Sequence, residues 1–192
     1  MKLSLEWSVD PGVTLALASY LALYVWRWRR ARAEGGPRAA SYWRLASFAG
    51  GILTLLVALG SPIDRLGEQL FVFHMAQHLL LTDIAAVLLL LGLTKVILRP
   101  VTARLQPVER RFGPLTHPLA GLALYVGTLW VWHLPSLYQL GLESPALHPL
   151  QHVSLLGAAL VFWWFVLAPV RPRRPLAGLA VVFYLAGAQL LA

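Results

Sequence analysis

Apolar side chains occupy six long stretches of this chain, and the polar residues are gathered between them. The stretches cover residues 11–28, 42–60, 69–92, 118–134, 147–170 and 176–192. Each is about 17 to 24 residues long, which is the length that an α-helix needs to cross the hydrocarbon core of a bilayer. The pattern therefore predicts an all-α protein, a polytopic transmembrane helical bundle of about six spans.

The composition supports a membrane protein and limits its chemistry. Of the 192 residues, 58% are hydrophobic and 12% are charged, whereas a soluble domain is about 45–50% apolar and about 25% charged. Six spans with short loops leave no room for a separate soluble domain, so we expect residues 1–192 to form a single transmembrane domain. The absence of cysteine excludes disulfides, thiolate metal sites, iron–sulfur clusters and covalent c-type haem.

Lysine and arginine gather in alternate loops. Fourteen of the 16 lie in residues 27–44, 95–111 and 171–174, and only Lys2 and Arg65 lie on the other side. Short loops rich in Lys and Arg stay in the cytoplasm, so the N-terminus is expected outside, with the third and fifth spans running inward. The net charge of +8 is then an insertion signal with a secondary attraction to anionic lipid, and nucleic acid is not an expected partner.

Five of the six histidines fall on the outer side of this predicted bundle. They are His74 and His78 in the outer half of the third span, His133 at the outer end of the fourth, and His148 and His152 at the outer start of the fifth. His117 alone is expected on the inner side. The i, i+4 spacing within each pair places both imidazoles on one helix face, about 5–6 Å apart at Cβ. That spacing allows two ligands to bind one metal ion.

The two histidine pairs repeat one pattern, H-x-x-Q-H, at residues 74–78 and 148–152. A Ser-Pro precedes each copy, at 61–62 and 144–145, although at different distances. We interpret this as a weak internal duplication of a two-helix unit. Because the third and fifth spans run in the same direction, both turns should lie at similar depth, and the four imidazoles are expected to converge.

Ionisable and polar groups inside a span are costly and tend to mark function. The chemical alternatives for the histidines are a metal ion, a haem held by one His from each helix, and a proton or quinone site. Imidazole suits Zn, Cu, Fe and Ni, and an outward-facing, cysteine-free cluster with Met75 beside it favours copper. Met75 points about 100° around the helix from His74, so packing is its simpler interpretation.

Four polar residues near the pairs are secondary candidates. Gln77 and Gln151 either orient imidazoles or bond between helices. Asp64, in the outer loop before the third span, would attract a cation, although a solvated loop acid is the simpler interpretation. Asp83 is the one acid deep in a span and lies about 140° around the helix from the nearer histidine. It is expected to be protonated or bonded to Thr82 or another helix, with a proton relay as the alternative.

Four ordered motifs resemble one known family. They are S-P-I-D at 61–64, H-M-A-Q-H-L-L-L at 74–81, W-H-L-P-S-L-Y at 132–138, and H-P-L-Q-H at 148–152 followed by F-W-W at 162–164. Over about residues 44 to 170 the chain resembles the CtaG-type cytochrome c oxidase assembly factors of bacteria. The resemblance implies an integral membrane factor needed to build active haem–copper oxidase, with a role in delivering copper to the catalytic subunit.

The sequence thus predicts a metallochaperone and not an enzyme. Its copper site would be built from His74, His78, His148 and His152, with His133 close by, facing outward from the bacterial cytoplasmic (inner) membrane. The expected partners are the lipid bilayer, a periplasmic copper donor and the catalytic subunit of cytochrome c oxidase. The alternatives are a b-type haem-binding electron-transfer protein and a metal transporter, and only Asp83 continues a polar path inward for the latter.

Overall fold

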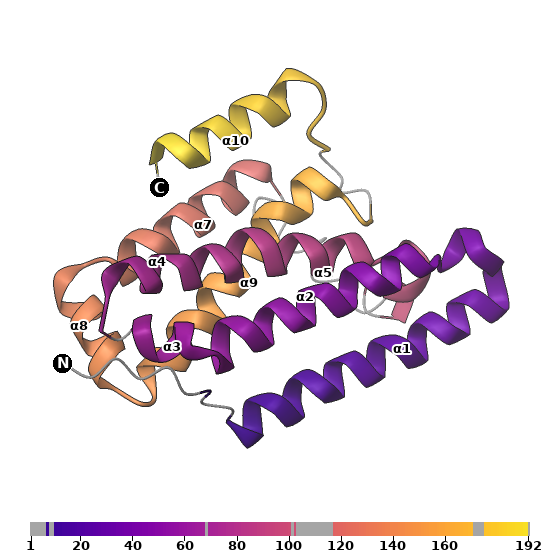
Figure 1. The fold of residues 1–192 in the computed structure, drawn as a ribbon. Coiled ribbons are helices and arrows are strands. Elements are labelled where there is room, and N and C mark those ends of the chain that lie inside the picture. The colour runs from indigo at the N-terminus through magenta and orange to yellow at the C-terminus, as the bar shows by residue number, and fades with distance from the viewer. Residues whose placement is uncertain are drawn as a thin grey trace. The chain divides into compact units, whose positions relative to one another are not determined.

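The computed structural model describes residues 7, 10–67, 69–100, 102, 117–170 and 175–191. All regular structure within these residues is helical (Figure 1), which confirms the predicted all-α class. The helices form two compact units, Met1–Leu98 and Arg99–Ala192. A single transmembrane domain stays a prediction. The basic residues that lie outside the described residues are Lys2, Arg104, Arg110, Arg111, Arg171, Arg173 and Arg174.

The described residues of the first unit include two long helices, one short helix and a third long helix with a π-helical middle. These are α1 (Pro11–Ala39), α2 (Tyr42–Gly60), α3 (Pro62–Gly67), and the continuous run of α4 (Phe71–Leu79), η1 (Leu80–Ala85) and α5 (Ala86–Gly92). Helix α2 packs against α1 on one side and against η1 and α5 on the other, while α3 packs against α4 (Figure 1). The α4–η1–α5 helix is therefore held along its whole length.

Helices α2 and α5 approach closely because glycines lie between them. A Cβ atom added at Gly51 would lie 2.8 Å from Leu89 Cγ and 3.0 Å from the Leu89 backbone nitrogen. A Cβ at Gly92 would lie 2.6 Å from the Phe48 Cβ. Small residues allow this kind of close backbone approach between membrane helices. Both glycines therefore set the distance between α2 and α5.

Side chains from α1 and α2 satisfy the carbonyl groups where α5 ends. The Tyr24 hydroxyl donates to the Gly92 carbonyl at 2.7 Å. The Arg44 guanidinium donates to the carbonyls of Leu91 and Leu93, both at 2.9 Å. The last carbonyls of a helix have no partner within it, so these contacts replace the water that would otherwise be needed.

Helix α1 is longer than the predicted span. It continues past Trp28 through the basic residues to Ala39, with a kink at Gly36 (φ 66°) where a loop was expected. Arginine is a good helix former, and the Trp28 indole donates to the Ser41 carbonyl at 3.1 Å. The Arg32 guanidinium lies 4.2 Å from the centre of the Tyr42 ring. The basic segment is thus ordered by contacts with the start of α2.

Four helices are given by the described residues of the second unit between Pro118 and Leu191. These are α7 (Pro118–Trp132), α8 (Pro135–Glu143), α9 (Leu147–Leu167) and α10 (Leu179–Leu191). Helix α9 packs against α7 and α8, and α10 packs against α7 (Figure 1). The short helix α8, which begins at a proline as α3 does, was not predicted from the apolar pattern.

Three helices within the described residues are long and apolar enough to cross a membrane: Tyr42–Gly60, Phe71–Gly92 and Leu147–Leu167. Helices Pro118–Trp132 and Leu179–Leu191 are apolar but shorter. The predicted boundaries of 42–60 are confirmed, and those of the other four apolar helices differ by a few residues at one or both ends. A membrane protein is therefore supported, whereas six spans and an outer N-terminus stay predictions.

Candidate metal centre

The first histidine pair lies on α4. His74 and His78 are 0% and 4% exposed, and their ring centroids lie 4.3 Å apart with an angle of 57° between the ring planes. The predicted i, i+4 arrangement on one helix face is confirmed. Two imidazoles at this separation are close enough to bind one ion.

Gln77, between these histidines, holds α4 to its neighbours. Its Nε2 donates to the Ala58 carbonyl of α2 at 2.8 Å and to Asp64 Oδ1 of α3 at 2.7 Å. Of the two roles expected for this glutamine, bonding between helices is the one observed. The simpler interpretation of Asp64 as a solvated loop acid is wrong, because α3 begins directly after α2 and directs this half-buried carboxylate toward Gln77.

The π-helix η1 follows the first pair directly. The Thr82 hydroxyl lies 2.8 Å from the His78 carbonyl, to which it donates, and 2.9 Å from Asp83 Oδ2. The expected bond between Asp83 and Thr82 is thus present. The angle of about 140° assumed for Asp83 holds only for an α-helix, and the π-helix changes that geometry. Such π-helical segments occur frequently at functional sites.

Met75 is half-buried on α4, and its expected packing role stays a prediction.

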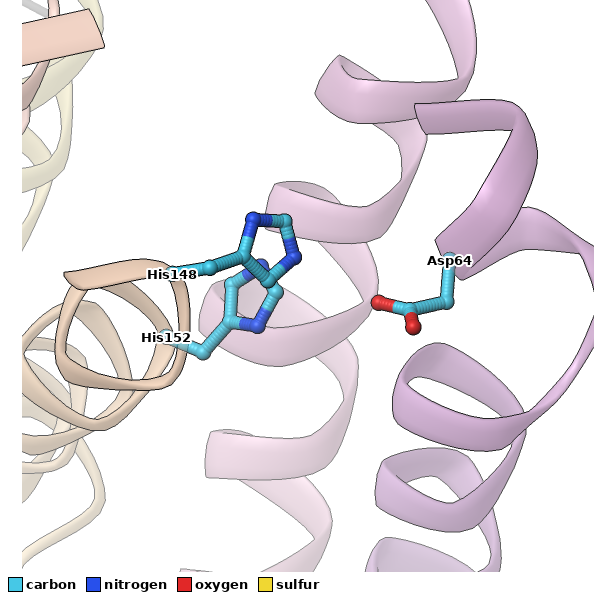
Figure 2. A group of neighbouring side chains, drawn as sticks. All are labelled: Asp64, His148 and His152. Atoms are coloured by element: carbon cyan, nitrogen blue, oxygen red, sulfur yellow. The ribbon is translucent and has the colours of Figure 1, made fainter. Parts of the chain in front are cut away.

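The second histidine pair lies on α9. The rings of His148 and His152 lie 4.5 Å apart in an edge-on arrangement of 79°, and Figure 2 shows both projecting from the same side of the helix. Figure 2 also draws Asp64, which belongs to α3 of the first unit. His152 is buried and His148 is half-buried. The second copy of the H-x-x-Q-H turn therefore also presents two imidazoles together.

A backbone carbonyl selects the tautomer of His148. Its Nδ1 lies 3.2 Å from the Gly141 carbonyl oxygen. That oxygen only accepts, so Nδ1 carries the proton and Nε2 keeps a lone pair. Metal-binding histidines commonly donate the other ring N–H to a carbonyl in this way, which orients the ring and fixes the ligating nitrogen.

The remaining two histidines lie at opposite ends of α7. The His133 ring is exposed, and its Nδ1 lies 2.7 Å from the Leu129 carbonyl, so its Nε2 also keeps a lone pair. The His117 Nδ1 accepts from the Leu119 backbone N–H at 3.2 Å and caps the helix. His117 is thus a structural cap, consistent with its exclusion from the predicted site.

Sequence reasoning missed two glycines that contact the glutamines of the turns. A Cβ at Gly67 would lie 3.3 Å from Gln77 Oε1, and one at Gly141 would lie 3.1 Å from Gln151 Oε1. Each glycine follows a leucine and precedes the first histidine of its turn by seven residues. This shared spacing could have been recognised in the sequence as part of the repeat. The internal repeat therefore extends beyond the five-residue pattern.

Chemically, each turn offers two imidazole nitrogens in a largely apolar helix. Imidazole ligands suit Cu, Zn, Fe and Ni, whereas Mg and Ca need more oxygen ligands than either turn supplies. The donor set therefore fits the predicted copper ion without selecting it over zinc.

Comparison with known proteins gives one family match. The sequence profile of the cytochrome c oxidase caa3 assembly factor family (Caa3_CtaG) matches residues 22–192. An uncharacterized protein of Mycobacterium leprae is 26% identical over 161 residues, which cover 71% of this chain. The matched part spans only 24% of the length of that relative. No solved structure matches the chain.

Proposed function

The chain belongs to the cytochrome c oxidase caa3 assembly factor family, and from this membership we propose that it binds copper and delivers it to the catalytic subunit of the oxidase. The observation that carries this proposal is the pair of H-x-x-Q-H turns. In each turn the centroids of the two imidazole rings lie within 4.5 Å of one another, on a mostly apolar helix. In His148 the contact of Nδ1 with the Gly141 carbonyl also keeps the ligand lone pair on Nε2.

A carrier must bind its ion tightly and still release it to a partner. Two imidazoles from one turn leave further coordination positions of a copper ion open, and an incoming ligand from the oxidase would enter there. His133, exposed at the end of α7, is a further imidazole for such an exchange. Because the ion is cargo and is not consumed, we propose a metallochaperone without enzymatic activity, supplied by a periplasmic copper donor.

Absorption and elemental analysis of the purified protein test this function against the haem alternative. We expect a protein without a Soret band that carries copper after incubation with Cu(II). A Soret band, together with bound iron, would contradict copper delivery and favour the b-type haem protein.

We further propose that the protein crosses the bacterial inner membrane about six times, with its N-terminus and both histidine turns on the outer side. The supporting observation is the sorting of basic residues, 14 of 16 of which fall in alternate segments. A reporter inserted at Gly35 is expected to behave as cytoplasmic, and one at Glu143 as exoplasmic. The opposite result would place the turns on the cytoplasmic side and exclude delivery from the periplasm.

Deletion of the protein tests its client. A strain without it should still make the oxidase polypeptide but leave the catalytic copper centre unfilled, with partial rescue by added copper. Copper content would be measured in the purified oxidase by elemental analysis. Normal copper content in that strain would contradict the assembly role and leave metal binding as a separate question.

A further inference from the structure

The two histidine turns belong to a longer repeat, and its two copies differ in the hydrogen bonds of their glutamines. In both, Leu-Gly is followed after six residues by H-x-x-Q-H, and the glycines Gly67 and Gly141 lie 74 positions apart. In both, a short helix ends at or near the glycine and the glutamine oxygen packs against it. Gln77 and Gln151 are therefore equivalent positions, and their surroundings can be compared directly.

The surroundings of the two glutamines are not the same. Both side chains are 0% exposed. The Gln77 amide has two acceptors in its own unit, the Ala58 carbonyl and the Asp64 carboxylate. Among the described residues, Oε1 has no hydrogen-bond partner in either glutamine, and in Gln151 the Nε2 group has none either. The position equivalent to Asp64, three residues before the glycine, is occupied by Tyr138. A buried carboxamide without protein partners requires a ligand or an ordered water.

Gly141 brings this carboxamide together with the second histidine pair. The Gln151 oxygen lies against the position that a Cβ of residue 141 would occupy, at 3.1 Å. The carbonyl of the same glycine lies 3.2 Å from His148 Nδ1. The carboxamide and the imidazole thus contact the same residue from one helix. A Cβ at residue 141 would require the carboxamide to shift by a few tenths of an ångström.

We propose that Gln151 binds a water ligand of copper at the second histidine pair, which makes this pair a site for hydrated Cu(II). The inference rests on the proposed copper function. A turn supplies only two imidazoles, whereas Cu(II) takes a square-planar or tetragonal set of N and O ligands, so water fills the other positions. Metal-bound water is a strong donor, and the Gln151 oxygen accepts its proton in a hydrogen bond. Cu(I) binds without such a water and does not use the carboxamide.

The test compares the two equivalent glutamines in the full chain, purified in detergent. Gln151→Leu removes both polar atoms at similar size, Gln151→Glu keeps the acceptor, and Gln77→Leu is the matched variant. The measurements are the melting temperature of the copper-free protein, the affinities for Cu(II) and for Cu(I), and the EPR spectrum of bound Cu(II).

We expect Gln151→Leu to melt no lower than the parent and to bind Cu(II) about 10- to 100-fold more weakly, as is typical when a residue bonded to a metal ligand is removed. Its affinity for Cu(I) should be unchanged, and its EPR spectrum should shift. Gln151→Glu should keep the parent's affinity for Cu(II). Gln77→Leu should lower the melting temperature, because it removes two interhelical hydrogen bonds.

Four results would overturn the inference. If Gln151→Leu melts as low as Gln77→Leu, or weakens Cu(II) and Cu(I) equally, Gln151 is a structural residue. If the parent binds Cu(I) alone, the water-binding role fails while copper delivery stands. If the parent binds neither ion, copper delivery fails and this inference fails with it.

Discussion

Replacing one imidazole of a pair, in His74→Ala or in His152→Ala, is expected to lower the affinity for copper well over tenfold. Each substitution leaves a single histidine in the turn and an incomplete ligand set in a buried position. A tenfold change corresponds to about 1.4 kcal/mol, which one lost metal ligand exceeds. The measurement is a copper titration of the purified protein, with the bound metal counted by elemental analysis.

His117→Ala is the control for these variants. Its imidazole caps α7 by accepting from the Leu119 N–H, so its loss should cost about 1 kcal/mol of stability and leave copper binding unchanged. Parent-like binding in all of the variants would contradict a metal role for the histidines.

The same variants distinguish one copper ion shared by both turns, as expected from the sequence, from a separate ion in each turn. If both turns bind the same ion, the double variant of His74 and His152 should lose little more than either single variant, because ligands acting as a unit are not additive. If each single variant keeps half of the bound copper, each turn binds its own ion.

Gly51→Ala is expected to destabilise the first unit, whereas Gly50→Ala is not. A methyl group at Gly51 would meet Leu89 Cγ at 2.8 Å and the Leu89 backbone nitrogen at 3.0 Å. The backbone of α5 must therefore move away from α2. Overpacking of this kind costs about 1–3 kcal/mol, which exceeds the gain of about 1 kcal/mol that alanine gives over glycine in a helix.

Gly50 is a matched control because it is the adjacent position of the same helix. A Cβ there would lie 3.6 Å from Leu88 Cδ1, which is an ordinary contact, so only the gain in helix propensity remains. Thermal unfolding in one detergent should give a lower melting temperature for Gly51→Ala and an equal or higher one for Gly50→Ala. Equal shifts would show that α2 and α5 do not depend on this close approach.

Several helices of the fold could be predicted from the sequence because their ends are marked locally. The segment 42–60 is mostly apolar, with Arg44 as its one charged residue, and Ser61-Pro62 follows its last glycine. The extension of α1 to Ala39 was not predictable from hydropathy, because contacts of Trp28 and Arg32 with the start of α2 hold it. The π-helix at Leu80–Ala85 carries no hydropathy signal, since it adds a residue to a turn without changing which residues are apolar.

The histidine pairs could be predicted because i, i+4 spacing alone places two side chains together on a helix. The hydrogen-bond partners of Gln77 could not be predicted, because Ala58 and Asp64 lie 19 and 13 residues away in the sequence. They reach Gln77 only because α3 reverses the direction of the chain. The contact of His148 with Gly141 depends in the same way on α8, whose apolar content is too low to be recognised as part of a span. The shared spacing of the two glycines is present in the sequence, but its meaning becomes clear only once their contacts with the glutamine oxygens are known.

The contacts of Arg44 limit how membrane orientation can be tested by charge substitution. Arg44 belongs to the segment 27–44 that supplies six of the basic residues, but its guanidinium is bonded to the Leu91 and Leu93 carbonyls. Removing it would leave helix-terminal carbonyls without donors and would reduce folding yield before it altered insertion. Arg29 and Arg38 are exposed, so they are the positions at which a charge reversal would report on the translocation machinery alone.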